Sequence, residues 1–342
     1  MDGYHIWGSS VVKGEDERYH MFATRVPANL PFHPAWMIAS EIVRATADSP
    51  EGPYQFAEVV LPARGADYWD GRSTHNPRML KVGDTYVLYY MGSTHPFEDV
   101  APCRANELTP TSKWAVVGRS NKRIGIATSD SVCGPWTRLD MPVLPTKPGT
   151  FYSHLTSNPS ACVAPDGKIY LMFKSRAYTK KFTDDGALWP VCGDMAIGMA
   201  IADKVDGPYT VMTPEPLFST ETFGEIEDPY MWCDEDGFHL LAKDQRGTIT
   251  GEHGNGILAH SADALHWELD AEPLAYTRYV TFDDGTQRKL GNLERCSGLF
   301  DENGKLTHLF FAVWEDERGF GCNKGTLPAW NMSVPLRRQV AE

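Results

Sequence analysis

Acidic residues stand at the entrance of three strand-like segments, and they are the side chains of this sequence best suited to chemistry. Glu227 and Asp228 precede the apolar run that begins at Tyr230, Glu294 precedes another such run, and Asp70 lies shortly before a third. Asp and Glu are poor strand residues, so a stable sheet alone does not account for them. Glycoside hydrolysis needs one carboxyl that protonates the leaving oxygen and another that activates water or attacks carbon. A third carboxylate nearby raises the pKa of the acid by like-charge repulsion.

Taken singly, such an acid is more typical of a solvated turn than of a catalytic site. Whether they form a site depends on the fold, and an internal repeat indicates which fold that is. Five copies of one motif begin near positions 9, 76, 158, 228 and 296, so the motif recurs at a nearly even spacing. Each copy is a small or polar pair, an apolar run, a turn of the Asn-Gly, Asp-Gly or Gly-Asp type, and an aromatic-rich run. These turns between apolar runs are strong hairpin signals.

A second motif follows each hairpin, starting near residues 42, 124, 197 and 256, with residues 330–334 as a degenerate fifth copy. Two hairpins per repeat and five repeats predict an all-β fold, a five-bladed β-propeller with four antiparallel strands per blade. We expect one domain over residues 1–342, with blades at 5–60, 70–140, 152–215, 224–272 and 292–338. A pair of β-sandwiches is the competing fold, but it does not explain the fivefold repetition. The longest inserts, 95–120 and 176–194, are expected to be loops over one face.

The first strand of each propeller blade is innermost, so the residues that enter these strands gather round one mouth of the central channel. The ring predicted in this way consists of Ser9 and Ser10, His75 and Asn76, Ser157 and Asn158, Glu227 and Asp228, and Glu294 and Arg295. Aromatic residues interleave with it, namely Trp7, Tyr68, Trp69, Tyr152, Tyr230 and Trp232. A polar ring with aromatic faces suits a sugar, whose CH face stacks while its hydroxyls pair with donors and acceptors.

The predicted catalytic residues are Asp70, Asp228 and Glu294, with Glu227 as the alternative acid. The predicted substrate-binding residues are Trp7, Ser9, Trp69, Arg72, His75, Asn76, His154, Asn158, Tyr230 and Arg295. Arg295 either pairs with Glu294 or grips a substrate carboxylate or sulfate through its planar guanidinium. An acidic sugar therefore stays open as the substrate.

Composition excludes several classes of partner. A formal net charge of -13 and the lack of basic patches exclude a nucleic-acid partner, and no stretch reaches the ~20 apolar residues of a membrane span. Seven cysteines without a CxxC pair predict neither a disulfide framework nor a zinc site. No signal peptide is visible, so a cytoplasmic protein is the literal expectation, and a periplasmic or secreted one requires a leader that has been removed. The oligomeric state is left open.

The blade pattern resembles that of the five-bladed propeller glycoside hydrolases of families 43, 32, 68 and 117. The segments that carry the resemblance to a bacterial group allied to families 43 and 117 are 7–13, 69–77, 157–160, 227–230 and 293–295. Family 43 takes its base, its pKa modulator and its acid from blades one, three and four. In this sequence the corresponding positions of blades one and three carry no acidic residue. The number of blades between successive acids is nevertheless the same, because the three acids here, Asp70, Asp228 and Glu294, stand on blades two, four and five. Their separations along the chain resemble those of family 117. Asp228-Pro229 resembles the Arg-Asp-Pro of families 32 and 68, with Glu227 in place of the Arg.

This resemblance implies a glycosidase that cleaves a plant or algal oligo- or polysaccharide, inverting and exo-acting, the latter favoured by inserts that close the pocket. Asp70 would be the general base (or nucleophile), Asp228 would orient the substrate and tune pKa, and Glu294 would be the general acid. No cofactor is required and no metal-ligand motif such as HExxH is present, while a structural calcium ion at the axis is a feature of relatives. Two alternatives remain: a sugar-binding propeller without catalysis, and a glycan phosphorylase or lyase on the same fold.

Overall fold

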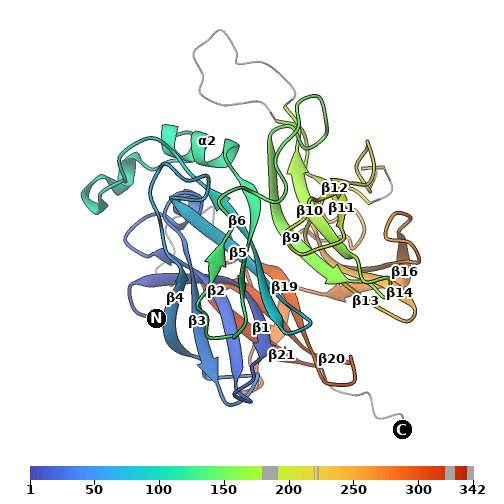
Figure 1. The fold of residues 1–342 in the computed structure, drawn as a ribbon. Helices are drawn as coiled ribbons and strands as arrows, with labels where there is room; N and C mark the ends of the chain where they lie inside the picture. The colour runs from blue at the N-terminus through green and yellow to red at the C-terminus, as the bar shows by residue number, and fades with distance from the viewer. Residues whose placement is uncertain (179–191, 219, 222, 320–327, 337–342) are drawn as a thin grey trace.

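The structure is a computed structural model that describes residues 1–178, 192–218, 220–221, 223–319 and 328–336. Its strands form five antiparallel sheets arranged round a common axis (Figure 1). Blade one contains β1 (Tyr4–Lys13), β2 (Tyr19–Pro27), β3 (Glu41–Ala47) and β4 (Gln55–Leu61). Blade two contains β5 (Ser73–Val82), β6 (Thr85–Ser93), β7 (Arg123–Ser129) and β8 (Thr137–Arg138). Blade three contains β9 (Leu155–Val163), β10 (Ile169–Arg176), β11 (Ala196–Ala202) and β12 (Thr210–Val211).

Blade four contains β13 (Ile226–Asp234), β14 (Gly237–Asp244), β15 (Gly256–Ser261) and β16 (Glu268–Tyr276). Blade five contains β19 (Asn292–Phe300), β20 (Leu306–Trp314) and β21 (Trp330–Pro335), which is three strands within the described residues. A small hairpin of β17 (Tyr279–Thr281) and β18 (Gln287–Lys289) precedes it and was not predicted. The five-bladed β-propeller predicted from the repeats is confirmed, and the degenerate copy at 330–334 is the strand that pairs with β20.

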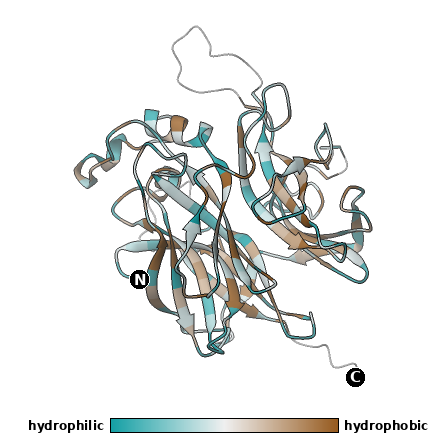
Figure 2. Ribbon diagram, in the orientation of Figure 1, coloured by the Kyte–Doolittle hydropathy of each residue, from teal (hydrophilic) through white to brown (hydrophobic). Residues whose placement is uncertain are grey.

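The five innermost strands close the ring, because β1, β5, β9, β13 and β19 each contact the next and β19 contacts β1. Hydrophobic residues concentrate along the strands of the blades (Figure 2). The core is a set of layers between neighbouring blades: Phe22 belongs to the same cluster as Leu88, for example, and Phe173 to the same cluster as Tyr89. A blade buries both faces only when it has a neighbour on each side, which is the reason that repeats of this kind fold as a closed set.

A further hydrophobic cluster, the cap cluster, covers one end of the ring. It joins Trp7 and the segment around α1 (Phe32–Ala35) to the insert at 95–120, and its insert residues include Val100, Leu108 and Trp114. The prediction that this insert is only a loop is wrong, because it contains a 3₁₀ helix, η1 (Pro102–Glu107), and α2 (Lys113–Ser120), the latter labelled in Figure 1. Apolar residues on these turns bury against the α1 segment. The insert at 176–194 lies mostly outside the described residues. No described helix is long and apolar enough to cross a bilayer.

Every innermost strand carries a bulge at the same place, and this shared bulge determines which side chains face the axis. The bulged residues have positive φ: 58° at Gly8, 55° at Asn76, 48° at Asn158, 55° at Asp228 and 55° at Arg295. The strand registers shift at these positions in all five blades. Bulges re-aim side chains, and Gly, Asn and Asp adopt the left-handed conformation at the lowest cost. In blade one the bulge falls at Gly8, so the residues equivalent to Glu227-Asp228 are Trp7-Gly8 rather than the predicted Ser9-Ser10.

Candidate active site

A small cavity lies on the axis, where the innermost strands begin, and has about 70 Å³ of room for solvent. All five blades contribute to its lining, which consists of Trp7, Phe32, Trp36, His75, Asn76, Asn158, Lys174, Glu227, Asp228, Glu294 and Arg295. The bulges explain why these side chains meet at the axis, because the bulged residue and the one before it project toward the axis in blades two, four and five. The cavity therefore combines three carboxylates, two cations and an aromatic wall.

The bulged residues are hydrogen-bonded to one another across the axis. Asn76 donates through Nδ2 to Oδ1 of Asn158 at 3.0 Å, and Asn158 donates through Nδ2 to Oδ1 of Asp228 at 2.7 Å. Arg295 donates to the same carboxylate twice, from Nη1 to Oδ1 and from its backbone N–H to Oδ2, both at 3.1 Å. Gly8 completes the set, and a Cβ there would lie 3.4 Å from Cβ of Arg295. Asp228 is thus the acceptor that joins blades three, four and five.

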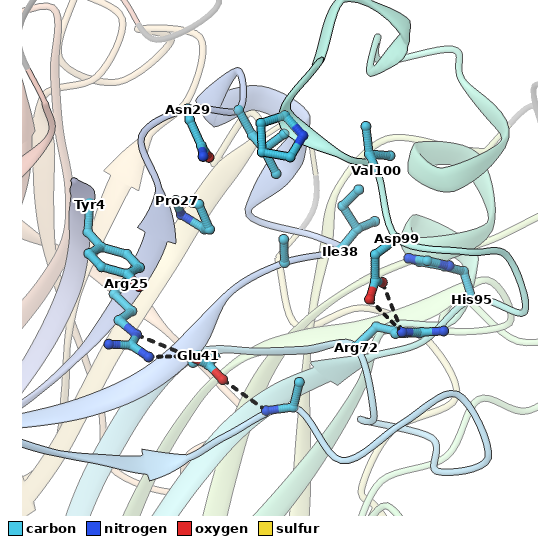
Figure 3. Close-up of a pocket in the computed structure, with 14 residues that line it drawn as sticks. Tyr4, Arg25, Pro27, Asn29, Ile38, Glu41, Arg72, His95, Asp99 and Val100 are labelled. Carbon is cyan, nitrogen blue, oxygen red and sulfur yellow. Dashed lines mark hydrogen bonds and ion pairs between the residues drawn. The ribbon is translucent and has the colours of Figure 1, made fainter. Parts of the chain in front are cut away.

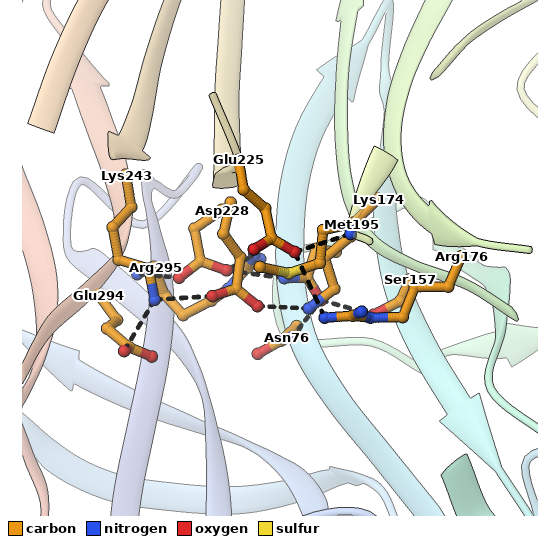
Figure 4. Close-up of polar contacts among 12 residues, drawn as sticks. Asn76, Ser157, Lys174, Arg176, Met195, Glu225, Asp228, Lys243, Glu294 and Arg295 are labelled. Carbon is orange, nitrogen blue, oxygen red and sulfur yellow. Dashed lines mark hydrogen bonds and ion pairs between the residues drawn. The ribbon is translucent and has the colours of Figure 1, made fainter. Parts of the chain in front are cut away.

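Beside this ring, one lysine joins the two glutamates. Nζ of Lys243 lies 2.7 Å from Oε2 of Glu227. It donates to Oε1 of Glu294 at 2.8 Å, and both of these residues are labelled in Figure 4. Lys174 contacts the other carboxylate oxygen of Glu227. Asn292 also donates to Oε1 of Glu294, at 2.8 Å. Oε2 of Glu227 and Oε1 of Glu294 contact the same nitrogen, at 2.7 and 2.8 Å. The distance between these two oxygens therefore cannot exceed the sum of the two contacts.

The surroundings push the pKa values of the two glutamates in opposite directions. Burial raises the pKa of Glu294; the Lys243 ammonium opposes this, while the charges of Asp228 and Glu227 raise it further. Burial also disfavours the charged form of Glu227, but the ammonium groups of Lys174 and Lys243 outweigh it and hold its pKa well below the ordinary value. A pair of carboxyls with separated pKa values is the arrangement in which one serves as acid and the other stays ionised.

The aromatic wall comes from blade one and from the segment around α1. Trp7 packs on Phe32 with ring centroids 4.9 Å apart. Trp36 stacks on His75 at 5.0 Å and donates from Nε1 to Nδ1 of His33 at 3.1 Å. Burial lowers the pKa of His75 far enough to keep the ring neutral, and the nearby cations Arg295, Lys122 and Lys174 add to this. These flat apolar faces can stack on the CH face of a sugar while the glutamates reach its oxygens.

Asp70, one member of the predicted triad, lies away from this cavity. Its carboxylate accepts from Nε of Arg64 at 2.7 Å and from the Tyr90 hydroxyl at 2.7 Å, with Nη1 of Arg138 at 3.4 Å. The Asp70 side chain is fully buried against Gly92, on blade two. The turn at 65–71 folds back toward β6 and β7, since Trp69 packs on Tyr90 with centroids 5.7 Å apart. The structure therefore brings Asp228 and Glu294 together without Asp70.

The other predicted residues divide in the same way. Those that line the cavity are Trp7, His75, Asn76, Asn158, Glu227 and Arg295, and those outside its lining are Ser9, Trp69, Arg72, His154 and Tyr230. Ser9 lies beyond the bulge, where its backbone carbonyl accepts from the Ser297 hydroxyl at 2.6 Å. Tyr230 is turned between blades and donates to the carbonyl of Gly298 at 3.0 Å. His154 is close to the cavity but bonded to Oγ of Ser120, with Nε2 and Oγ 3.1 Å apart.

Arg72 faces a second cavity of about 450 Å³, between blade one and the insert (Figure 3). Its Nη1 donates to both oxygens of Asp99, at 2.9 and 2.8 Å. Arg25 and Glu41 form a second ion pair in the same wall, at 2.6 Å. The charged groups of this cavity are thus largely paired with each other, and we assign it no role in the chemistry.

Four site residues were not predicted: Phe32, Trp36 and Lys174, which line the cavity, and Lys243, which contacts both glutamates. The two lysines occupy equivalent places on the second strands of blades three and four, with Lys174 opposite Ser157 and Lys243 opposite Glu227. The repeats could have revealed both lysines, because a lysine at the equivalent position of two apolar strands is visible in the sequence. Trp36 had no such signal, because it comes from the connection between β2 and β3.

The residues at the axis do not fit the calcium ion that the family resemblance implies. Calcium takes about six to eight oxygen ligands. Here the Asp228 carboxylate is already bonded to Arg295 and Asn158, and the Arg295 guanidinium places a positive charge beside it. Oδ1 of Asn76 is the axial amide oxygen that has no hydrogen-bond partner in the described parts of the chain. Among those residues, no group of three or more His, Cys, Asp or Glu side chains could hold a metal ion.

No protein-family model and no curated protein matches the chain. Solved structures do resemble it. A family 117 glycoside hydrolase of the marine bacterium Zobellia galactanivorans is 18% identical, with 97% of this chain and 83% of that chain covered and a TM-score of 0.60. The endo-arabinase of Bacteroides thetaiotaomicron VPI-5482 is 13% identical, with 99% and 96% covered and a TM-score of 0.60.

A family 43 β-xylosidase/α-arabinofuranosidase from a compost microbial metagenome, in complex with xylotriose and in a calcium-free form, is also 13% identical. The match covers 99% of this chain and 93% of that chain, with a TM-score of 0.60. These likenesses extend over almost the whole length of both partners. They show that the chain shares the propeller fold of these glycoside hydrolases.

Proposed function

We propose that the chain is a glycoside hydrolase whose reaction takes place between Glu294 and Glu227. The observation that carries this proposal is the pair of buried glutamates on one Lys243 ammonium, with pKa values displaced in opposite directions. A protonated carboxyl and an ionised carboxyl within one sugar ring's reach are the parts that hydrolysis of a glycosidic bond requires. The structural neighbours, which are glycoside hydrolases of families 43 and 117, support the same reaction class.

In this proposal Glu294 is the general acid. It donates its proton to the glycosidic oxygen as the bond between that oxygen and the anomeric carbon breaks. The Glu227 carboxylate forms a bond to the anomeric carbon, and a water that gives its proton to Glu294 then releases the sugar and restores Glu227. Lys174 and Lys243 keep Glu227 ionised before the reaction, and Asp228 holds the axial ring together rather than touching the reacting bond.

The spacing of the two glutamates favours this retaining reaction over the inverting one expected from the resemblance. Carboxyls of retaining enzymes lie about 5–5.5 Å apart, whereas inverting enzymes separate them by roughly 6.5–9.5 Å to admit a water. Contacts of 2.7 and 2.8 Å to one Lys243 nitrogen bring one oxygen of Glu227 and one of Glu294 within the retaining spacing. The inverting expectation came from the family resemblance, and Asp70, the base expected there, is not among the residues that line the axial cavity.

The small cavity, closed on one side by Trp7, Phe32 and Trp36, supports removal of a single terminal sugar. Plant and algal oligosaccharides are the substrates of choice for a screen, because the neighbours include an arabinase, a xylotriose complex and an enzyme of a marine bacterium.

The test is a screen of aryl glycosides and such oligosaccharides with wild-type protein and three variants: Glu294→Gln, Glu227→Gln and Asp70→Asn. We expect the two glutamate variants to lose about 10²–10⁴-fold in kcat, the usual contribution of such a group, while Asp70→Asn keeps its turnover. Glu294→Gln should lose least on dinitrophenyl glycosides, whose leaving group needs no proton.

Turnover that survives both glutamate substitutions would refute the assignment. Saturable sugar binding without release of sugar by the wild type would instead identify a binding propeller, and dependence on phosphate or an unsaturated product would identify a phosphorylase or lyase. Release of the opposite anomer, followed by NMR, would overturn the retaining step alone.

A further inference from the structure

A buried lysine lies beside the candidate active site. Lys122 lies between the end of α2 and the start of β7, and its side chain is 2% exposed. Its Nζ lies 5.1 Å from the ring centroid of Trp36, a lining residue of the cavity. Among the described residues no carboxylate comes within ion-pair distance of it. A buried ammonium without a partner costs several kcal/mol in effective desolvation, so a stable fold alone does not account for Lys122.

The cations around Lys122 already have partners of their own. Lys174 is paired with Glu227, and Arg176 lies 3.6 Å from Glu225. Arg123 donates from Nη1 to backbone carbonyls, among them that of Lys122 at 2.7 Å.

The carboxylates at the axis, in contrast, already have their own cations. Glu227 and Glu294 share Lys243, and Asp228 has Arg295. Lys122 is therefore surplus positive charge beside Trp36, which belongs to the aromatic wall of the cavity.

We propose that the sugar bound at this site carries an anionic substituent, a carboxylate or a sulfate ester, and that Lys122 binds it. The inference rests on the proposed glycosidase function and names its substrate class. An ammonium held against the Trp36 ring can bond an anion attached to a sugar that stacks on the same wall. The neighbouring imidazoles do not compete as cations, since burial lowers the pKa of both His33 and His154 to about 4.

The neutral form of Lys122 gives the rival explanation, in which the amine takes part in the reaction. Burial and the charges of Lys174 and Arg119 lower its pKa, as is found for lysines that act as bases or nucleophiles. The two explanations differ in what they predict for neutral sugars. An anion-binding Lys122 matters for acidic sugars alone, whereas a reacting Lys122 matters for every substrate.

Binding is measured by calorimetry in the Glu294→Gln background, so that the result does not depend on turnover. The probes are D-glucuronate, D-galacturonate and galactose 6-sulfate, each compared with neutral glucose or galactose. We expect an acidic probe to bind about 10–100-fold more tightly than its neutral counterpart, as one hydrogen bond to a charged group provides. Comparison of the uronate probes with the sulfated probe shows whether the site prefers a carboxylate or a sulfate ester.

Lys122→Met should abolish this preference, Lys122→Arg should restore part of it, and Lys168→Met, which alters an exposed lysine on blade three, should leave it intact. Lys122→Met should also unfold at a higher temperature than its parent without ligand, because it removes a buried unpaired charge.

Equal binding of acidic and neutral probes, or a preference that survives Lys122→Met, would overturn the proposal. So would a lower unfolding temperature of Lys122→Met, or an equal loss of turnover on neutral and acidic aryl glycosides in the active background. Selective anion binding by a protein that hydrolyses nothing would refute the proposed glycosidase and leave the anion site standing.

Discussion

Replacing Lys243 by methionine tests the central pair of glutamates most directly. The ammonium lies 2.7 and 2.8 Å from Glu227 and Glu294, and at an effective dielectric constant of about 20 each contact is worth roughly 6 kcal/mol of attraction. Desolvation of the three ions offsets most of this sum. Breaking a buried pair by removal of one partner costs about 3–5 kcal/mol, because the remaining charges lose their compensation. At about 2 °C per kcal/mol this corresponds to an unfolding temperature lower by roughly 6–10 °C.

The loss should depend on pH in a defined direction. In the wild type, Lys174 and Lys243 hold the pKa of Glu227 well below its ordinary value, so its ionised form stabilises the fold at neutral pH. Without Lys243 the pKa values of both glutamates rise, and a carboxyl with a raised folded pKa loses stability as pH increases through that value. The difference between wild type and Lys243→Met should therefore be larger at pH 8 than at pH 5.

Thermal unfolding followed by tryptophan fluorescence measures this at both pH values, with Lys168→Met as the exposed control. The double variant Lys243→Met/Glu227→Gln should recover part of the loss, since it removes one of the charges left behind. An unfolding temperature within about 2 °C of wild type at pH 8, or a larger loss at pH 5, would refute the reasoning.

Three further predictions follow from the same geometry. Asp70→Asn should destabilise the fold by about 3 kcal/mol, because Arg64 and Arg138 lose a buried partner, yet leave kcat/KM within about threefold of wild type; a hundredfold loss in a folded variant would return Asp70 to the reaction. Since burial raises the pKa of Glu294 and the protonated form is the acid, kcat/KM should fall as pH rises through that value, and Glu294→Gln should lack this alkaline limb in a pH–rate profile. Gly8→Ala should cost about 1–2 kcal/mol, because Gly8 has a φ of 58°; an unchanged denaturant midpoint would contradict this.

The repeats determined the architecture from the sequence alone, because hairpins are local structures whose turns and apolar runs lie within a few residues. The small or polar pair that begins each repeat marked the entrance of the innermost strand, and the acids at these entrances were singled out by that position. Glu227, Asp228 and Glu294 were found for this reason. The alternation of side chains along a strand, together with one shared bulge, fixes their direction toward the axis.

The tertiary structure alone decided the rest. Asp70 precedes β5 by a turn, where no periodicity sets the direction of a side chain, and contacts with Arg64 and Tyr90 from other parts of the chain turned it away from the axis. Trp36 reached the cavity because the cap cluster packs its segment over the end of the ring. Lys243 became the link between two acids because blades four and five are neighbours, although Glu294 comes much later in the sequence. Local sequence determines structure within a blade, whereas a site at the axis depends on how five blades close.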